Sequence, residues 1–131
     1  MCIRDRIDRL QDHERLTKVC VEDMAGEAKK LRTEDYVFCM TMGHSTDRPI
    51  LNALFEKISD PVYVGAIGSK SKRGALTREL KSDGIEAERV EKIICPIGLK
   101  IGSNQPAEIA ISIAAQLLQH RDESKKSQPE A

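Results

Sequence analysis

The stretch YVGAIGSKSKRGAL, residues 63–76, runs from an apolar strand through Gly-Ser into a helix that begins with lysine and arginine. Residues 62–67 form the predicted strand and residues 69–82 the predicted helix, with Gly84 as its stop signal. A strand that leads directly into a helix is the repeating unit of parallel α/β sheets. Because the free N–H groups at a helix start favour an anion, this turn predicts a phosphate site.

The same strand-then-helix pattern occurs one unit earlier. Residues 36–41 are almost continuously apolar, as is typical of parallel strands buried on both faces. Residues 43–47 turn the chain into a helix, for which Ser45, Thr46 and Asp47 are candidate N-caps. Two such units in series imply right-handed crossovers. The predicted fold class is therefore α/β: a Rossmann-like parallel sheet flanked by helices, with the first half of the domain missing.

The rest of the chain carries weaker signals. Residues 18–22 form a short β-like run, residues 24–31 a short helix, and residues 93–99 a short strand or extended segment. The last helix, beginning near Ser103, has little polar face and is predicted to be mostly buried. Residues 121–131 are polar and predict a frayed tail.

Composition excludes several kinds of partner. The chain has 131 residues, enough for one domain, with 21 Lys and Arg balanced by 21 Asp and Glu. A net charge of zero and 3% aromatic residues argue against nucleic acid and anionic membranes. No apolar run is long enough to span a bilayer. We therefore expect a soluble globule with no nucleic-acid and no membrane partner.

The cysteines indicate a reducing, cytoplasmic location. Cys20, Cys39 and Cys95 are widely spaced, without a C-x-x-C pair or a zinc pattern. Cys95, next to a turn-rich segment, is a weak candidate for a metal ligand or a sulfur carrier. A buried, inert thiol is the commoner case for such a residue.

The first six residues, MCIRDR, match the in-frame translation of a sequencing-library adapter, ATG TGT ATA AGA GAC AG. We interpret residues 1–6 as such a scar and exclude them from the fold. On this interpretation the chain is a fragment, and residues 7–34 are the remnant of the preceding Rossmann half. Residues 35–122 form the main domain, and residues 123–131 form a polar tail.

Two predicted loops lie at the carboxyl edge of the sheet, where open parallel sheets bind ligands. In the second, Gly68 allows close approach of a ligand, and the polar residues that follow can contact a phosphate: Ser69, Lys70, Lys72 and Arg73. Ser69 is also a candidate N-cap of the helix that follows. A solvated basic helix start explains the same residues equally well. In the first loop, His44 and Asp47 are a candidate base and orienting carboxylate. A loop histidine beside a capping aspartate is the more common arrangement.

Three motifs in order carry a resemblance to a known family. They are Thr41-x-Gly-His-x-x-Asp47, Tyr63-Val-Gly-x-Ile-Gly-Ser-x-x-Lys-Arg73, and Pro96-Ile-Gly-Leu-x-Ile-Gly102 followed by Pro106-x-Glu-Ile-Ala-x-Ser-Ile-Ala-Ala-Gln116. Together, across about residues 35–121, they resemble the C-terminal Rossmann domain of the XdhC/CoxI family of xanthine dehydrogenase accessory factors. Such proteins usually carry a preceding glycine-rich βαβ unit that this sequence lacks.

The resemblance implies a cofactor chaperone rather than an enzyme. Such a protein binds the molybdenum cofactor, a molybdopterin, and delivers it to a molybdenum hydroxylase such as xanthine dehydrogenase. It also implies a sulfurtransferase partner and a homodimer. The implied cofactor-binding residues are Gly68, Ser69, Lys70, Lys72 and Arg73, the pocket wall Thr41, Gly43, His44 and Asp47, and the third-loop residues Pro96, Gly98 and Gly102.

Two alternatives remain open from the sequence. The first is an NAD(P)-dependent oxidoreductase domain, which requires a G-x-G-x-x-G turn after an earlier strand. The second is a redox or sulfur-transfer enzyme that uses Cys95, which requires an exposed thiol with a lowered pKa. The sequence shows no full catalytic constellation, and this favours binding over catalysis.

Overall fold

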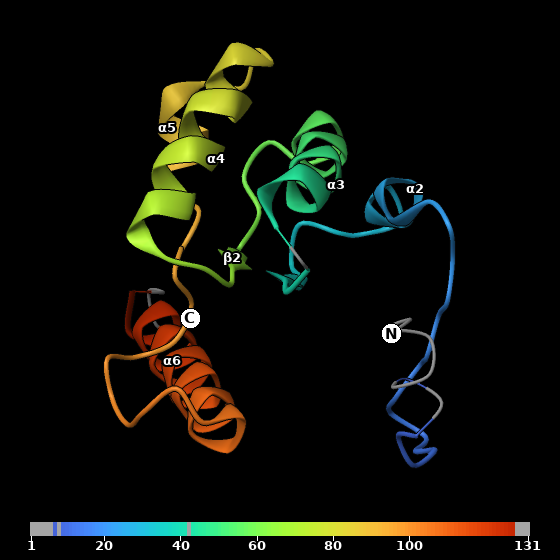
Figure 1. The fold of residues 1–131 in the computed structure, drawn as a ribbon, viewed down its shortest axis with the longest axis vertical. Helices are drawn as coiled ribbons and strands as arrows, with labels where there is room; N and C mark the ends of the chain where they lie inside the picture. The colour runs from blue at the N-terminus through green and yellow to red at the C-terminus, as the bar shows by residue number, and fades with distance from the viewer. Residues whose placement is uncertain (1–6, 8, 42, 128–131) are drawn as a thin grey trace.

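The structure, a computed structural model, describes residue 7, residues 9–41 and residues 43–127 (Figure 1). Helices and strands alternate through its central part. The elements are α2 (Met24–Ala28), β1 (Tyr36–Cys39), α3 (His44–Lys57), β2 (Tyr63–Ala66), α4 (Lys70–Ser82), α5 (Ala87–Glu91) and α6 (Pro106–Ser127). None of the helices in these residues is long and apolar enough to cross a membrane.

The sheet is parallel, as the strand-then-helix pattern predicts. β1 and β2 pair in register from Tyr36 opposite Tyr63 to Cys39 opposite Ala66. Ile94 adds a single parallel bridge to the far side of β2, donating to the Val64 carbonyl at 2.9 Å. The predicted strand or extended segment at residues 93–99 is therefore extended, with one bridge to the sheet. The fold class is confirmed as α/β with a small parallel sheet.

The core lies between one face of the sheet and helices α3, α4 and α5. Apolar residues of α3 recur every three or four positions, so they form one buried stripe. The cluster joins that stripe to the two strands and to the other two helices: Val37, Cys39, Leu51, Leu54, Phe55, Ile58, Val64, Ala66, Leu76, Leu80 and Val90. Each fully buried leucine contributes about 1.5–3 kcal/mol relative to exposure. This layer holds the starts of α3 and α4 over the strand ends.

The opposite face of the sheet is aromatic, and α6 lies on that side (Figure 1). The rings of Tyr36 and Tyr63 stack with centroids 5.3 Å apart, and the His120 ring of α6 meets both edge-on. The Tyr36 hydroxyl and His120 Nδ1 are 3.0 Å apart. The result is three layers, with α3, α4 and α5 on one side of the sheet and α6 on the other.

The expectation that the last helix is mostly buried is wrong. Ile111 is 62% exposed and Leu118 is 51% exposed. α6 meets the rest of the protein through Ser112, Gln116 and His120, which recur every four residues and so share one face. Because this polar row faces inward, apolar residues such as Ile111 and Leu118 point to solvent, and others such as Ile113 are only partly buried.

Two further expectations differ from the structure. Residues 18–22 do not form a strand, and the side chains of Val19 and Val21 are exposed. α6 continues to Ser127, so residues 121–127 are helical rather than a frayed tail. Residues 128–131 lie outside the described part of the chain.

Candidate functional site

Three segments meet at the carboxyl edge of the sheet. The loop after β1 is tied to the loop after β2, because the Ile67 N–H donates to the Cys39 carbonyl at 2.9 Å. The third segment joins them where the Ile97 N–H donates to Ala66 at 3.2 Å. The Cys95 thiol lies 3.9 Å from the Ser69 carbonyl oxygen. The three motifs found in the sequence are therefore brought to one edge.

The first loop contains a buried charge. α3 begins at His44, with Gly43 as its N-cap and no side-chain cap, so the prediction of Ser45, Thr46 or Asp47 as caps is wrong. Asp47 instead lies in the first turn of α3 and is fully buried. One of its oxygens accepts from the Thr41 hydroxyl, and the other is 2.6 Å from the Lys72 ammonium.

The side chain of His44 lies outside the described part of the structure. Its predicted pairing with Asp47 therefore stays a prediction.

The second loop forms a capped helix start. The Ser69 hydroxyl accepts from the Lys72 N–H at 3.3 Å, which confirms Ser69 as the N-cap of α4. Gly68 has φ +156°, and a side chain there would run into the methylene chain of Lys72. Ser69, Lys70 and Arg73 are exposed. Among the described residues, neither Lys70 nor Arg73 has an ion-pair partner, so both charges face solvent.

The third segment anchors α6. The Gly98 N–H donates to Gln116 Oε1 at 2.9 Å, and Gln116 Nε2 donates back to the Gly98 carbonyl at 3.3 Å. The Tyr63 hydroxyl donates to the same Oε1 at 2.9 Å. Gly98 and Gly102 both have positive φ, +100° and +69°, and both lie against α6. Pro96 is exposed beside them. These glycines therefore position α6.

Cys39 and Cys95 are both buried, which agrees with the expectation of buried, inert thiols. Cys95 is buried, and burial raises the pKa of its thiol, although nearby Lys72 and Arg73 act in the opposite direction. Burial, with the Asp47 charge, raises the pKa of Cys39 to about 12. The hypothesis of an exposed Cys95 thiol with a lowered pKa is therefore wrong. No group of three or more His, Cys, Asp or Glu side chains that could hold a metal ion occurs in the described ranges, and the assignment of Cys95 as a weak metal ligand stays a prediction.

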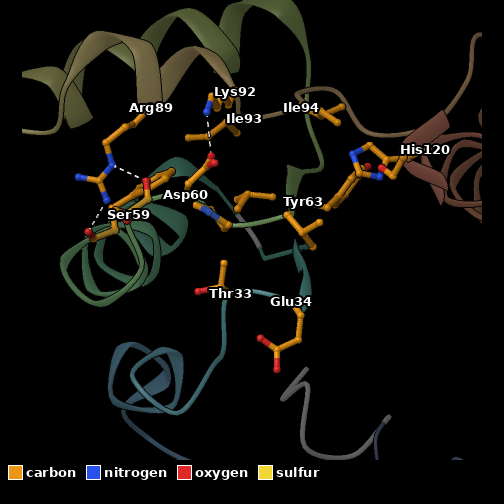
Figure 2. Close-up of a pocket in the computed structure, with 15 residues that line it drawn as sticks. Thr33, Glu34, Ser59, Asp60, Tyr63, Arg89, Lys92, Ile93, Ile94 and His120 are labelled. Atoms are coloured by element: carbon orange, nitrogen blue, oxygen red, sulfur yellow. Dashed lines mark hydrogen bonds and ion pairs between the residues drawn. The ribbon is translucent and has the colours of Figure 1, made fainter. Parts of the chain in front are cut away.

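A cavity of about 650 Å³ opens at the opposite, amino-terminal edge of the sheet (Figure 2). Its charged groups are engaged within the protein: Lys92 pairs with Asp60 at 2.8 Å, and Arg89 donates to the Ser59 carbonyl at 2.9 Å. None of the residues predicted to bind a cofactor lines it. Since ligands of open parallel sheets bind at the carboxyl edge, we place the candidate site there and not in this cavity.

Sequence reasoning missed two features of the site. It did not pair Asp47 with Lys72, and it gave Gln116 no role beyond its place in a motif. The spacing of Ser112, Gln116 and His120 at four residues was the available signal for a polar face on α6.

Fold and site together define a Rossmann-like α/β domain with a basic helix start at the carboxyl edge of its sheet. The sequence model of the XdhC Rossmann domain matches residues 2–117. The chain therefore belongs to the XdhC family.

Two known proteins are similar to this chain, one in sequence and one in both sequence and structure. The chain is 33% identical over 96 residues to the uncharacterized protein YqeB of Escherichia coli K12, covering 72% of this chain and 17% of that protein. It also matches the crystal structure of a xanthine dehydrogenase from Bacillus halodurans with a TM-score of 0.60 and 34% identity. That match covers 83% of this chain and 31% of the solved chain. The chain thus spans less than a third of the length of either relative.

Proposed function

We propose that this chain is the cofactor-binding domain of a xanthine dehydrogenase accessory protein. It holds the molybdenum cofactor and delivers it to a molybdenum hydroxylase such as xanthine dehydrogenase. The observation that carries the proposal is an XdhC Rossmann domain whose carboxyl edge presents an exposed, basic helix start. On this proposal the client enzyme and a sulfurtransferase are the protein partners, and a homodimer is the expected assembly.

The residues at the start of α4 suit the terminal phosphate of a molybdopterin. The N–H groups of Lys70 and Ser71 lie in the first turn, where no intrahelical carbonyl accepts them. They would bind the phosphate together with the Ser69 hydroxyl and the side chains of Lys70 and Arg73, which are exposed. When bound, the cofactor supplies the molybdenum centre that the client enzyme uses. The role of this chain is to hold and orient it.

The test is a titration of the full chain with molybdenum cofactor and, separately, with NAD(P). Lys70→Ala and Arg73→Ala should each weaken cofactor binding about tenfold, because each removes a charge-assisted hydrogen bond to phosphate. Arg78→Ala is the matched control, since Arg78 is an exposed basic residue further along α4. The dissociation constant of the Arg78→Ala variant for the molybdenum cofactor should equal that of the parent chain.

Two results would contradict the proposal. Binding of NAD(P) without binding of the molybdenum cofactor would assign the chain to the alternative, an oxidoreductase domain. Cofactor binding that is unchanged in a Lys70→Ala/Arg73→Ala double variant would place the phosphate elsewhere on the protein.

A further inference from the structure

Lys72 differs from the other basic residues of the phosphate turn, because its charge is engaged inside the protein. Its side chain is only 14% exposed, and its ammonium lies 2.6 Å from Asp47 Oδ2. It also donates to the Ile67 carbonyl at 2.5 Å. Lys70 and Arg73, by contrast, are exposed. The turn thus contains two kinds of cation, one internal and two that face solvent.

The internal cation joins four points of the fold. Thr41 follows β1, Asp47 lies in the first turn of α3, Ile67 follows β2 and Lys72 lies in the first turn of α4. The Thr41 hydroxyl donates to Asp47, and the Lys72 ammonium forms an ion pair with Asp47 and donates to the Ile67 carbonyl. We call this cluster the Asp47–Lys72 clamp. It links both strand ends to both helix starts at the candidate site.

Lys72 also determines the shape of the turn. Its methylene chain lies against Gly68, where a side chain would collide with it. Its backbone N–H donates to the Ser69 hydroxyl that caps α4. A displacement of Lys72 would therefore move the residues that face the phosphate.

Physical chemistry opposes a direct role for Lys72 with an anion. Asp47 is fully buried, and a buried carboxylate that loses its cation carries a large desolvation penalty. Asp47 and the Ile67 carbonyl already take two of the contacts that the ammonium can make, and a Lys72 side chain that turned away from them toward a phosphate would leave Asp47 uncompensated. A phosphate beside the intact pair would meet one positive and one negative charge 2.6 Å apart, so the net attraction from Lys72 would be small.

We infer that Lys72 is a positioning residue, which acts through the Asp47–Lys72 clamp to hold the phosphate turn in place. Ser69, Lys70, Arg73 and the first N–H groups of α4 then make the contacts with the anion. For the identity of that anion, the inference rests on the proposed function.

The experiment compares single and double variants of the clamp in the full chain. The molybdenum cofactor is the binding probe, and the urea midpoint reports stability. Lys72→Met and Asp47→Leu should each lower the midpoint and weaken binding, because each leaves a buried charge unpaired. The double variant Asp47→Leu/Lys72→Met should recover the midpoint and bring the dissociation constant to within about threefold of the parent, since neutral pairs can replace buried ion pairs.

A direct role for Lys72 gives a different pattern. The double variant would then regain stability but still bind about tenfold more weakly than the parent, as expected for Arg73→Ala. That result would overturn the inference. Asp47→Asn/Lys72→Gln, a polar and neutral pair, gives the same comparison if the apolar pair does not fold. A midpoint that no double variant recovers would also overturn it.

The experiments distinguish a failure of the proposed function from a failure of the inference about Lys72. If the parent chain binds no molybdenum cofactor, the proposed function is wrong. The midpoints of the single and double variants still show whether the Asp47–Lys72 clamp exists.

Discussion

At the scale of single residues, Gly98 shows why the third motif contains a glycine. Its φ is +100°, and an added Cβ would lie 2.6 Å from the Ser112 hydroxyl oxygen. Gly98→Ala should therefore destabilise the protein by about 1–3 kcal/mol, through backbone strain and displacement of α6. Urea unfolding measures the change.

Two other glycines are matched controls for Gly98→Ala. Gly74 lies within α4 with open space around it, so Gly74→Ala should stabilise by about 0.5–1 kcal/mol. Gly84 has φ +101°, but an added Cβ would meet open space. The loss of stability in Gly84→Ala therefore measures the backbone strain of a positive φ without a steric contact. Equal losses at positions 98 and 84 would mean that the contact with Ser112 adds nothing.

Some residue roles at this site could be predicted from the sequence, and others could not. Ser69 was correctly predicted as a cap, because capping depends on neighbours within one turn. The roles of Asp47 and Lys72 were not, because their pairing depends on how two helix starts meet in space. A local pattern identifies an acidic residue in a first turn but does not reveal its distant partner.

At the scale of elements, the end of α4 is bound to α3 by one carboxylate. Arg48 donates to both oxygens of Asp83, at 2.7 and 2.5 Å, and Asn52 adds a bond at 2.8 Å. These hydrogen bonds, those from Arg48 first, lower the pKa of Asp83 from its ordinary 3.8 to about 2. The link therefore depends on pH.

The pH dependence of this link has a definite sign. Because the folded pKa lies below the unfolded value, the stabilisation is complete above about pH 5 and is lost as the pH falls through about 2. The difference in unfolding free energy between the parent chain and Asp83→Asn should shrink over this range. Arg48→Gln should shift the loss toward pH 4. A difference that stays constant from pH 5 to pH 2 would contradict the assigned pKa.

Elements with a strong apolar period were predicted well, and those without one were not. The stripe on α3 and the apolar runs of the strands gave the parallel sheet and its main layer. The burial of α6 was predicted wrongly because its apolar composition was assumed to face the sheet. The polar row Ser112, Gln116 and His120 took that position instead, because Gly98, Tyr63 and Tyr36 present hydrogen-bonding groups there.

At the scale of the whole molecule, the two layers around the sheet differ in kind. The layer of α3, α4 and α5 is held by a continuous apolar cluster, whereas α6 is attached through hydrogen bonds and aromatic contacts. Segments with few buried apolar contacts open at lower free energy than the core. The α6 layer should therefore open while the rest of the domain stays folded.

Hydrogen exchange measures this difference directly. Amides in the middle of α3 should exchange at least about tenfold more slowly than those in the middle of α6, since opening α6 leaves the apolar cluster intact. Gln116→Leu removes the bonds to Gly98 and Tyr63, so it should speed exchange in α6 and leave α3 unchanged. Gln119→Leu, at an exposed position of the same helix, is the control. Equal protection of α3 and α6, or a loss of protection in both with Gln116→Leu, would show that the molecule unfolds as one unit.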